Sequence, residues 1–181
     1  METIPNFTLP NVGSGPDPFD LETAAADVST DAIVLLFQRD HHCPKCRQQV
    51  QDVADRYGEF EALDTLVVSI LPESTEKATE WQDAYDLPYP LLADESKGVS
   101  DEFDQPTRFG ALGGLHDMIG RMPFAMVLDV RDGEPTPIFT HKGSMPADRP
   151  SIDDLLDSVQ SKSTDMPAAS VDDRDGLQND Q

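Results

Sequence analysis

Cys43 and Cys46 are the residues of this sequence best suited to chemistry, and they are the only cysteines among its 181 residues. A Cys-x-x-Cys spacing brings two thiols close enough to exchange electrons with a partner by forming and breaking a disulfide. The same spacing supplies half of a zinc site. Four histidines could complete such a site: His41, His42, His116 and His141. None of them recurs at a paired spacing with the cysteines, which favours a redox dithiol over a zinc site.

The segments around the cysteines predict how the thiols are positioned. Residues 32–37 form a continuous apolar run, typical of a central strand buried on both faces, and they lead directly to the cysteines. From Cys46 onwards apolar residues recur every three or four positions, which predicts an amphipathic helix with Pro44 in its first position. Cys43 then lies at the helix N-terminus, where the dipole favours a thiolate. We therefore expect Cys43 to attack and the more buried Cys46 to resolve.

Charged residues beside the pair act on Cys43 in opposite directions. Lys45 and a protonated His41 or His42 would favour the thiolate, whereas the carboxylate of Asp40 would oppose it if it lies close. His42 is also a candidate for positioning a substrate or moving a proton, although loop histidines are commonly solvated. The sequence leaves the sum of these effects open.

The remaining pattern predicts one domain over residues 1–161 and an acidic tail over residues 162–181. The domain contains further expected elements: an edge strand at 4–9, a strand at 65–71, a helix at 74–85, a hairpin of strands at 124–130 and 136–141, and a terminal helix at 151–161. Pro135 and Pro137 confine the second strand of the hairpin to a sheet edge. The tail lacks apolar periodicity, which predicts disorder.

The segment from Leu35 to Arg47 resembles the active-site stretch of the redoxins related to alkyl hydroperoxide reductase and thiol-specific antioxidant, the AhpC/TSA family. Residues 4–10, 88–94 and 121–129 resemble this family in the same order. The resemblance implies a thioredoxin-like α/β fold, with a central mixed β-sheet flanked by helices on both faces. It also implies a thiol-dependent oxidoreductase that reduces hydroperoxides or exchanges disulfides. Its redox group would be the Cys43–Cys46 disulfide, with no other cofactor.

The resemblance gives roles to two further residues. Arg121 matches the arginine with which peroxiredoxins stabilise the thiolate and polarise the peroxide, and a permanently charged guanidinium suits that task. A surface ion pair is an equal alternative for Arg121, because acidic residues outnumber it everywhere. Pro123 stands where thioredoxin-fold proteins carry a cis-proline that helps to dock the substrate.

Two positions depart from the family pattern. Peroxiredoxins carry a Pro-x-x-x-Thr/Ser-x-x-Cys motif whose hydroxyl holds the peroxide, and here Leu36 and Asp40 occupy the proline and hydroxyl positions. An ionised carboxylate at Asp40 cannot donate a hydrogen bond to the leaving oxygen. One alternative is therefore a thioredoxin-like disulfide reductase without peroxidase activity. The alternative from another class is a redox-inert zinc-binding or interaction module.

The formal net charge is −22, from 35 acidic and 13 basic residues. Such a surface repels nucleic-acid phosphates and anionic lipid, which argues against both as partners. The expected partners are a thioredoxin- or glutaredoxin-type reductant and a hydroperoxide or protein disulfide, and a homodimer is allowed. The charge resembles that of proteins from salt-accumulating halophiles, where high ionic strength screens self-repulsion.

Without a leader-like N-terminus or a long apolar segment, the sequence predicts a cytoplasmic protein.

Overall fold

The computed structural model describes residues 3–107 and 120–164. These residues form a five-stranded sheet in the order β5-β4-β3-β6-β7. Its strands are β3 (Ala32–Phe37), β4 (Thr65–Leu71), β5 (Leu91–Ala93), β6 (Phe124–Asp129) and β7 (Thr136–Lys142). The sheet is mixed, because β3, β4 and β5 are parallel whereas β6 pairs antiparallel with both β3 and β7. β7 lies at the sheet edge, as its prolines predict.

β3 occupies the middle of the sheet because all six of its residues are apolar and buried. Its side chains alternate between two cores, with Val34 and Leu36 in one and Ile33 and Leu35 in the other. A shift of one residue would exchange the side chains that face each core, so the register of β3 is strongly specified. The end of β3, from which the chain continues to the cysteines, is therefore fixed in place.

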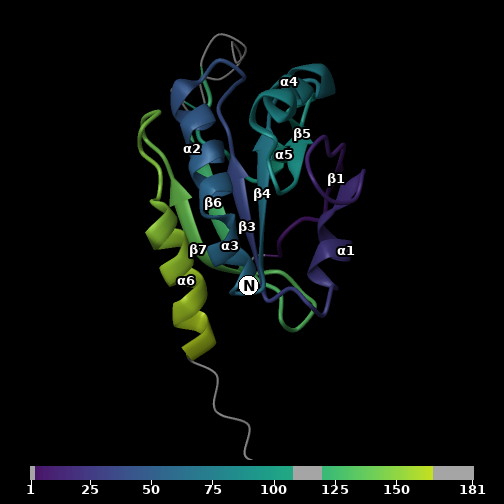
Figure 1. Cartoon of the computed structure of the whole chain (residues 1–181), viewed down its shortest axis with the longest axis vertical. Coiled ribbons are helices and arrows are strands. Elements are labelled where there is room, and N and C mark those ends of the chain that lie inside the picture. Colours follow the sequence, from purple (N-terminus) through teal and green to yellow (C-terminus); the bar gives the residue numbers. More distant parts are fainter. Residues whose placement is uncertain (1–2, 108–119, 165–181) are drawn as a thin grey trace, which may run out of the picture.

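Helices cover both faces of the sheet (Figure 1). One face shares its core with α2 (Pro44–Asp55), α3 (Tyr57–Glu61), α4 (Thr75–Tyr85) and α6 (Ile152–Thr164). The other face shares its core with β1 (Thr8–Leu9), β2 (Phe19–Asp20), α1 (Leu21–Ala25) and residues in and beside α5 (Gly98–Glu102). The predicted mixed sheet between two helical layers is confirmed. No helix within residues 3–107 and 120–164 is both long and apolar enough to cross a membrane.

The helix predicted after Cys43 is present as two pieces. α2 ends at Asp55, and α3 begins at Tyr57 after a residue, Arg56, whose φ of −114° and ψ of 16° are not helical. The predicted apolar stripe is nevertheless buried along its whole length: Cys46, Val50, Val53, Tyr57 and Phe60. Burial of this stripe against the sheet holds both pieces in place.

The first strand and the last helix have different bounds from those expected. The edge strand expected at residues 4–9 is reduced to β1, which pairs with β2 instead of joining the main sheet. Pro5 and Pro10, on either side of residues 6–9, lack a backbone N–H donor, which limits how long a strand can be. The terminal helix α6 runs to Thr164, so the first three residues of the expected tail are helical. Residues 165–181 lie outside the described residues.

Candidate functional site

Cys43 and Cys46 form a disulfide at the N-terminus of α2. Cys43 is the N-cap residue, and its Sγ accepts a hydrogen bond from the backbone N–H of Cys46 at 3.1 Å. The Cα atoms of the two cysteines are 5.2 Å apart. Cys43 is 3% exposed and Cys46 is fully buried, so Cys46 is the deeper sulfur, as predicted. Once the disulfide is reduced, the helix dipole and the N–H of Cys46 favour a thiolate at Cys43.

Two guanidinium groups reach the sulfurs. Arg149, in the segment before α6, places Nη2 2.8 Å from Cys46 Sγ and 3.7 Å from Cys43 Sγ. Arg39, just after β3, places Nη1 3.8 Å from Cys43 Sγ, and its backbone N–H donates to Cys46 Sγ at 3.3 Å. Burial, together with the charge of Arg39, lowers the pKa of Arg149 to about 10, so Arg149 is still charged at neutral pH. Both positive charges favour ionised sulfur.

Two buried glutamines hold the guanidinium of Arg149. Gln38 directly follows β3, and Gln49 lies on the buried side of α2. Nη1 of Arg149 donates to Oε1 of Gln38 at 3.0 Å and to Oε1 of Gln49 at 2.6 Å. The amide of Gln38 also donates to Oε1 of Gln49 at 3.2 Å. The three side chains thus form a polar network within the core, and Arg149 connects it to the disulfide.

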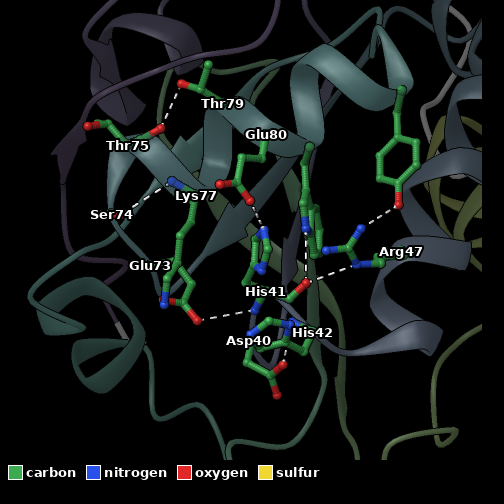
Figure 2. A network of polar contacts seen from close by, with 12 residues as sticks. Asp40, His41, His42, Arg47, Glu73, Ser74, Thr75, Lys77, Thr79 and Glu80 are labelled. Atoms are coloured by element: carbon green, nitrogen blue, oxygen red, sulfur yellow. Dashed lines mark hydrogen bonds and ion pairs between the residues drawn. The ribbon is translucent and has the colours of Figure 1, made fainter.

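His41 attaches the loop between β3 and α2 to α4 (Figure 2). Its buried ring points toward α4, with Nε2 2.7 Å from the carboxylate of Glu80, and its backbone N–H donates to Glu73 at 3.2 Å. Its carbonyl oxygen accepts hydrogen bonds from Nε1 of Trp81 at 3.1 Å and from Nε of Arg47 at 3.0 Å. These contacts fix the backbone that presents the cysteine pair.

Asp40 and His42 lie in the same loop and make local contacts. Oδ1 of Asp40 accepts a hydrogen bond from the backbone N–H of His42 at 2.8 Å, which closes a tight turn. The exposed ring of His42 packs edge-on against His41, with ring centroids 4.9 Å apart. Within the described part of the chain, neither side chain hydrogen-bonds to a sulfur. Their predicted roles in positioning a substrate stay predictions.

Arg121 lies near the site but is paired elsewhere. Its Nη2 forms an ion pair with Asp101 of α5 at 2.7 Å, which matches the ion-pair alternative. Its carbonyl oxygen accepts a hydrogen bond from Nε of Arg39 at 2.7 Å. Among the described residues, the guanidiniums that hydrogen-bond to sulfur belong to Arg39 and Arg149. Arg121 therefore touches the site by positioning Arg39, and its expected direct role stays a prediction.

The expectation of a cis-proline at Pro123 is wrong, because the Met122–Pro123 bond is trans. The backbone on both sides of this bond is held by hydrogen bonds. The carbonyl of Met122 accepts from the side chain of Gln105 at 3.1 Å, and that of Pro123 accepts from the N–H of Gly143 at 2.8 Å. These bonds hold the backbone on both sides of the trans bond, and a substrate-docking role for Pro123 stays a prediction.

The sequence-based prediction missed Gln38, Arg39, Gln49 and Arg149 as site residues. Gln38 and Gln49 carry a local signal, since one directly follows a strand buried on both faces and the other lies three residues after Cys46 on the helix. Arg149 carries none. It is 103 residues away from Cys46 in the chain, and only tertiary folding brings the two together.

The zinc alternative finds no ligand set in the described residues. No group of three or more His, Cys, Asp or Glu side chains in that part of the chain could hold a metal ion. The ring of His41 faces Glu80, and that of His141 lies 2.8 Å from Asp148. His116 lies outside the described residues.

Comparison with known proteins places these features in a family. The model of the AhpC/TSA family matches residues 1–119. The chain is 29% identical over 79 residues to peroxiredoxin Bcp of Bacillus subtilis, which covers 44% of this chain and 50% of that protein. It is 30% identical over 115 residues to chloroplastic peroxiredoxin Q of Sedum lineare, which covers 60% of this chain and 62% of that protein. The matched regions thus span less than two thirds of these relatives.

Solved structures share the fold. Peroxidoxin BcpB of Mycobacterium tuberculosis superposes with a TM-score of 0.67 at 22% identity, over 88% of this chain and 95% of that one. The mitochondrial 2-Cys peroxiredoxin of Plasmodium falciparum superposes with a TM-score of 0.70 at 15% identity, over 90% of this chain and 92% of that one. The predicted thioredoxin-like fold is confirmed. With its family model matched over most of its length and its cysteine pair at the start of α2, the chain belongs to the AhpC/TSA family.

Proposed function

We propose that this protein is a thiol-dependent peroxidase that reduces hydroperoxides through Cys43 and Cys46. The observation that carries the proposal is the Cys43–Cys46 disulfide at the N-terminus of α2, with the guanidiniums of Arg39 and Arg149 within 3.8 Å of its sulfurs. A nucleophile needs an ionised sulfur, and a helix N-terminus with two positive charges stabilises that form.

The proposed cycle has three steps. The Cys43 thiolate attacks the terminal peroxide oxygen, the O–O bond breaks, and the alkoxide leaves as an alcohol after taking a proton, so Cys43 becomes a sulfenic acid. Cys46 then attacks the Cys43 sulfur, the S–O bond breaks, and water leaves as the disulfide forms. An external dithiol of the thioredoxin or glutaredoxin type returns two electrons and two protons. The reductant itself becomes a disulfide.

The structure accounts for the second step without a large rearrangement. The Cα distance of 5.2 Å lies in the range that disulfides normally span, and α2 keeps its helical start at Pro44 with the disulfide closed. Resolution therefore requires no unwinding of α2.

Stopped-flow mixing of the reduced protein with hydrogen peroxide or an organic hydroperoxide tests this function. Trp81, the single tryptophan, hydrogen-bonds to the loop before the cysteines and provides a fluorescence signal. We expect both thiols to be lost at micromolar peroxide, and no reaction in Cys43→Ser. Cys46→Ser should react once and stop at a sulfenic acid, seen by mass spectrometry as one added oxygen. Wild-type thiols that persist at micromolar peroxide would contradict the proposal.

A second candidate function, disulfide exchange without peroxidase activity, is favoured by Asp40. This residue occupies the position of the peroxide-holding hydroxyl, and its carboxylate accepts a hydrogen bond from the backbone of His42. Reduction of a protein disulfide such as that of insulin would measure this activity. Fast insulin reduction combined with slow peroxide reduction would select the second candidate.

A further inference from the structure

Arg149 distinguishes between the two sulfurs of the disulfide. Its Nη2 lies 2.8 Å from Cys46 Sγ but 3.7 Å from Cys43 Sγ, so the shorter contact is with the fully buried sulfur. The guanidinium of Arg39 behaves in the opposite way, since its only sulfur contact is 3.8 Å from Cys43. The Arg149 guanidinium thus contacts both sulfurs and lies closer to Cys46, whereas the Arg39 guanidinium contacts Cys43 alone.

The orientation of Arg149 is set by acceptors around its guanidinium. Nη1 donates to Gln38 and Gln49 at 3.0 and 2.6 Å, and Nε donates to the carbonyl of Pro146 at 3.0 Å. Nη2 is left to face the sulfurs. Because the glutamines are buried and bonded to each other, the group is held ready in this position before any reaction.

The charge of Arg149 has no carboxylate partner among the described residues. Its acceptors there are two amide oxygens, one backbone carbonyl and the two sulfurs. A partly buried cation without an anion is costly, and the nearby charge of Arg39 adds repulsion. An ionised Cys46 would supply the missing negative charge at 2.8 Å.

We propose that Arg149 is a catalytic residue for Cys46, which it stabilises as a thiolate in both halves of the redox cycle. The inference rests on the proposed dithiol function and deepens it. During oxidation, the Cys46 thiolate attacks Cys43 sulfenic acid, forms the S–S bond and releases the oxygen as water after protonation. During reduction, a thiolate of an external dithiol attacks Cys43, the S43–S46 bond breaks, and its electron pair leaves on Cys46.

The direction of the reductive attack follows from burial and charge together. Cys46 is fully buried, so an external thiolate reaches Cys43, which retains 3% exposure. The leaving sulfur is then Cys46, and a leaving thiol with a lower pKa departs faster. The arginine that contacts Cys46 thus lies where negative charge develops.

Titration of a single thiol tests this role directly. In Cys43→Ser protein, Cys46 is the only thiol, and its ionisation is followed by thiolate absorbance in the ultraviolet as the pH is varied. Adding Arg149→Gln should raise the titration midpoint by about one pH unit or more, since an opposite charge at this distance shifts a pKa by that amount. Adding Arg56→Gln, which removes the same charge from a partly exposed position just beyond the far end of α2, should leave the midpoint unchanged.

Two further variants, Arg39→Gln and Arg149→Lys, show whether a shift of the midpoint is specific to Arg149 and to its charge. Adding Arg39→Gln to Cys43→Ser should move the midpoint less than half as far as Arg149→Gln does, because the Arg39 side chain contacts Cys43. Adding Arg149→Lys should give an intermediate shift, since lysine keeps the charge without the fork that spans the glutamines and the sulfurs. If Arg149→Gln does not fold, the midpoint of Arg149→Lys provides the test instead. An unmoved midpoint in both Arg149 variants, or equal shifts for Arg39 and Arg149, would overturn the proposal.

The reduction rate supplies a second readout in protein that retains both cysteines. Reduction of the disulfide by excess dithiothreitol should be about threefold to tenfold slower in Arg149→Gln than in wild type, because Cys46 becomes a poorer leaving group. Thiol counts before and after oxidation distinguish a failure of the proposed function from a failure of the role of Arg149. If wild type forms no reversible disulfide, the proposed function fails; if it does and Arg149→Gln changes neither readout, only the role of Arg149 fails.

Discussion

At the residue scale, the chemistry of the cysteine pair depends on one arginine close to it in the sequence, Arg39, and one far away, Arg149. Lys45 is exposed on the first turn of α2, and the carboxylate of Asp40 is engaged in a turn with the backbone of His42. The positive charges at the sulfurs come from Arg39 and Arg149 instead. Asp40 occupies the position where the family has a hydroxyl donor, and an ionised carboxylate there cannot donate a hydrogen bond to the peroxide.

Replacing Asp40 by threonine should restore that donor. We expect Asp40→Thr to react with hydrogen peroxide about tenfold faster or more than wild type, because one well-placed donor to a developing oxyanion is worth at least this much. The measurement is the second-order rate from Trp81 fluorescence.

Asp40→Val is the matched control for this change. Valine has the shape of threonine and also removes the negative charge, but it offers no hydroxyl. Equal rates for the two variants would show that any gain comes from the lost charge.

At the element scale, the start of α2 is held by three attachments. β3 ends directly before the loop, Cys43 caps the helix with Pro44 in the first position, and His41 ties the loop to α4. The first two attachments join segments that are adjacent in the sequence, whereas the third depends on the packing of α4 against the loop. The loop that presents Cys43 is thereby fixed from both sides.

Trp81→Phe tests the attachment to α4. The change keeps an aromatic ring but removes the donor to the carbonyl of His41, so we expect unfolding free energy to fall by about 1–3 kcal/mol. Urea denaturation measures it. Tyr85→Phe removes only a half-buried hydroxyl that accepts from Arg47 and should cost less than about 1 kcal/mol. A smaller loss for Trp81→Phe than for Tyr85→Phe would contradict this account.

Asp20 gives a second test at this scale, through pH. Its carboxylate caps α1 by accepting from the N–H of Thr23 at 2.8 Å and also accepts from the hydroxyl of Thr8 at 2.8 Å. These hydrogen bonds lower the pKa of Asp20 from 3.8 to about 2. A lowered pKa adds stability that is fully present above pH 3.8 and is lost as pH falls through about 2.

We therefore expect Asp20→Ala to cost about 1 kcal/mol of unfolding free energy at pH 7. The difference from wild type should shrink between pH 4 and pH 2, because wild type itself loses the ionised cap in that range. Urea denaturation of both proteins at several pH values measures the difference. A gap that stays constant down to pH 2 would rule out the ionised carboxylate as its source.

At the scale of the whole molecule, the fold combines two well-packed cores with a surface of high negative charge. The cores on the two sides of the sheet are closed by helices and contain the largest buried side chains, among them Trp81, Tyr89, Phe19 and Phe37. The net charge of −22 acts against this compact state through self-repulsion. Stability at low ionic strength is the sum of these opposed contributions.

Salt should therefore stabilise the protein. Between about 0.1 M and about 1 M KCl the Debye length falls from about 10 Å to about 3 Å. We expect the midpoint of thermal unfolding to rise over this range at pH 7. Near pH 4, where the net charge is close to zero, the same salt increase should have a much smaller effect. A midpoint that is independent of salt at pH 7 would contradict the proposed adaptation to high salt.

The sequence by itself determined the parts of this protein that depend on local pattern. The apolar run of β3, the helical stripe from Cys46 to Phe60 and the Cys-x-x-Cys spacing each specify their structure over a few residues, because backbone periodicity and burial are read directly from residue type. Together they predicted the buried central strand, the helix that starts at the cysteines and the relative burial of the two sulfurs, whereas the mixed sheet was implied by the family resemblance. Short elements such as α1 and α5 have too few residues to show a period.

The tertiary structure alone decided that Arg149 meets the sulfurs and that Arg121 does not. Arg149 lies 103 residues beyond Cys46, so its contact depends on how the segment before α6 folds back over α2. Arg121, which the family resemblance placed at the thiolate, is directed to Asp101 because α5 presents that carboxylate 2.7 Å away. Electrostatic partners are set by distance in space, and a sequence pattern carries distance only along the chain.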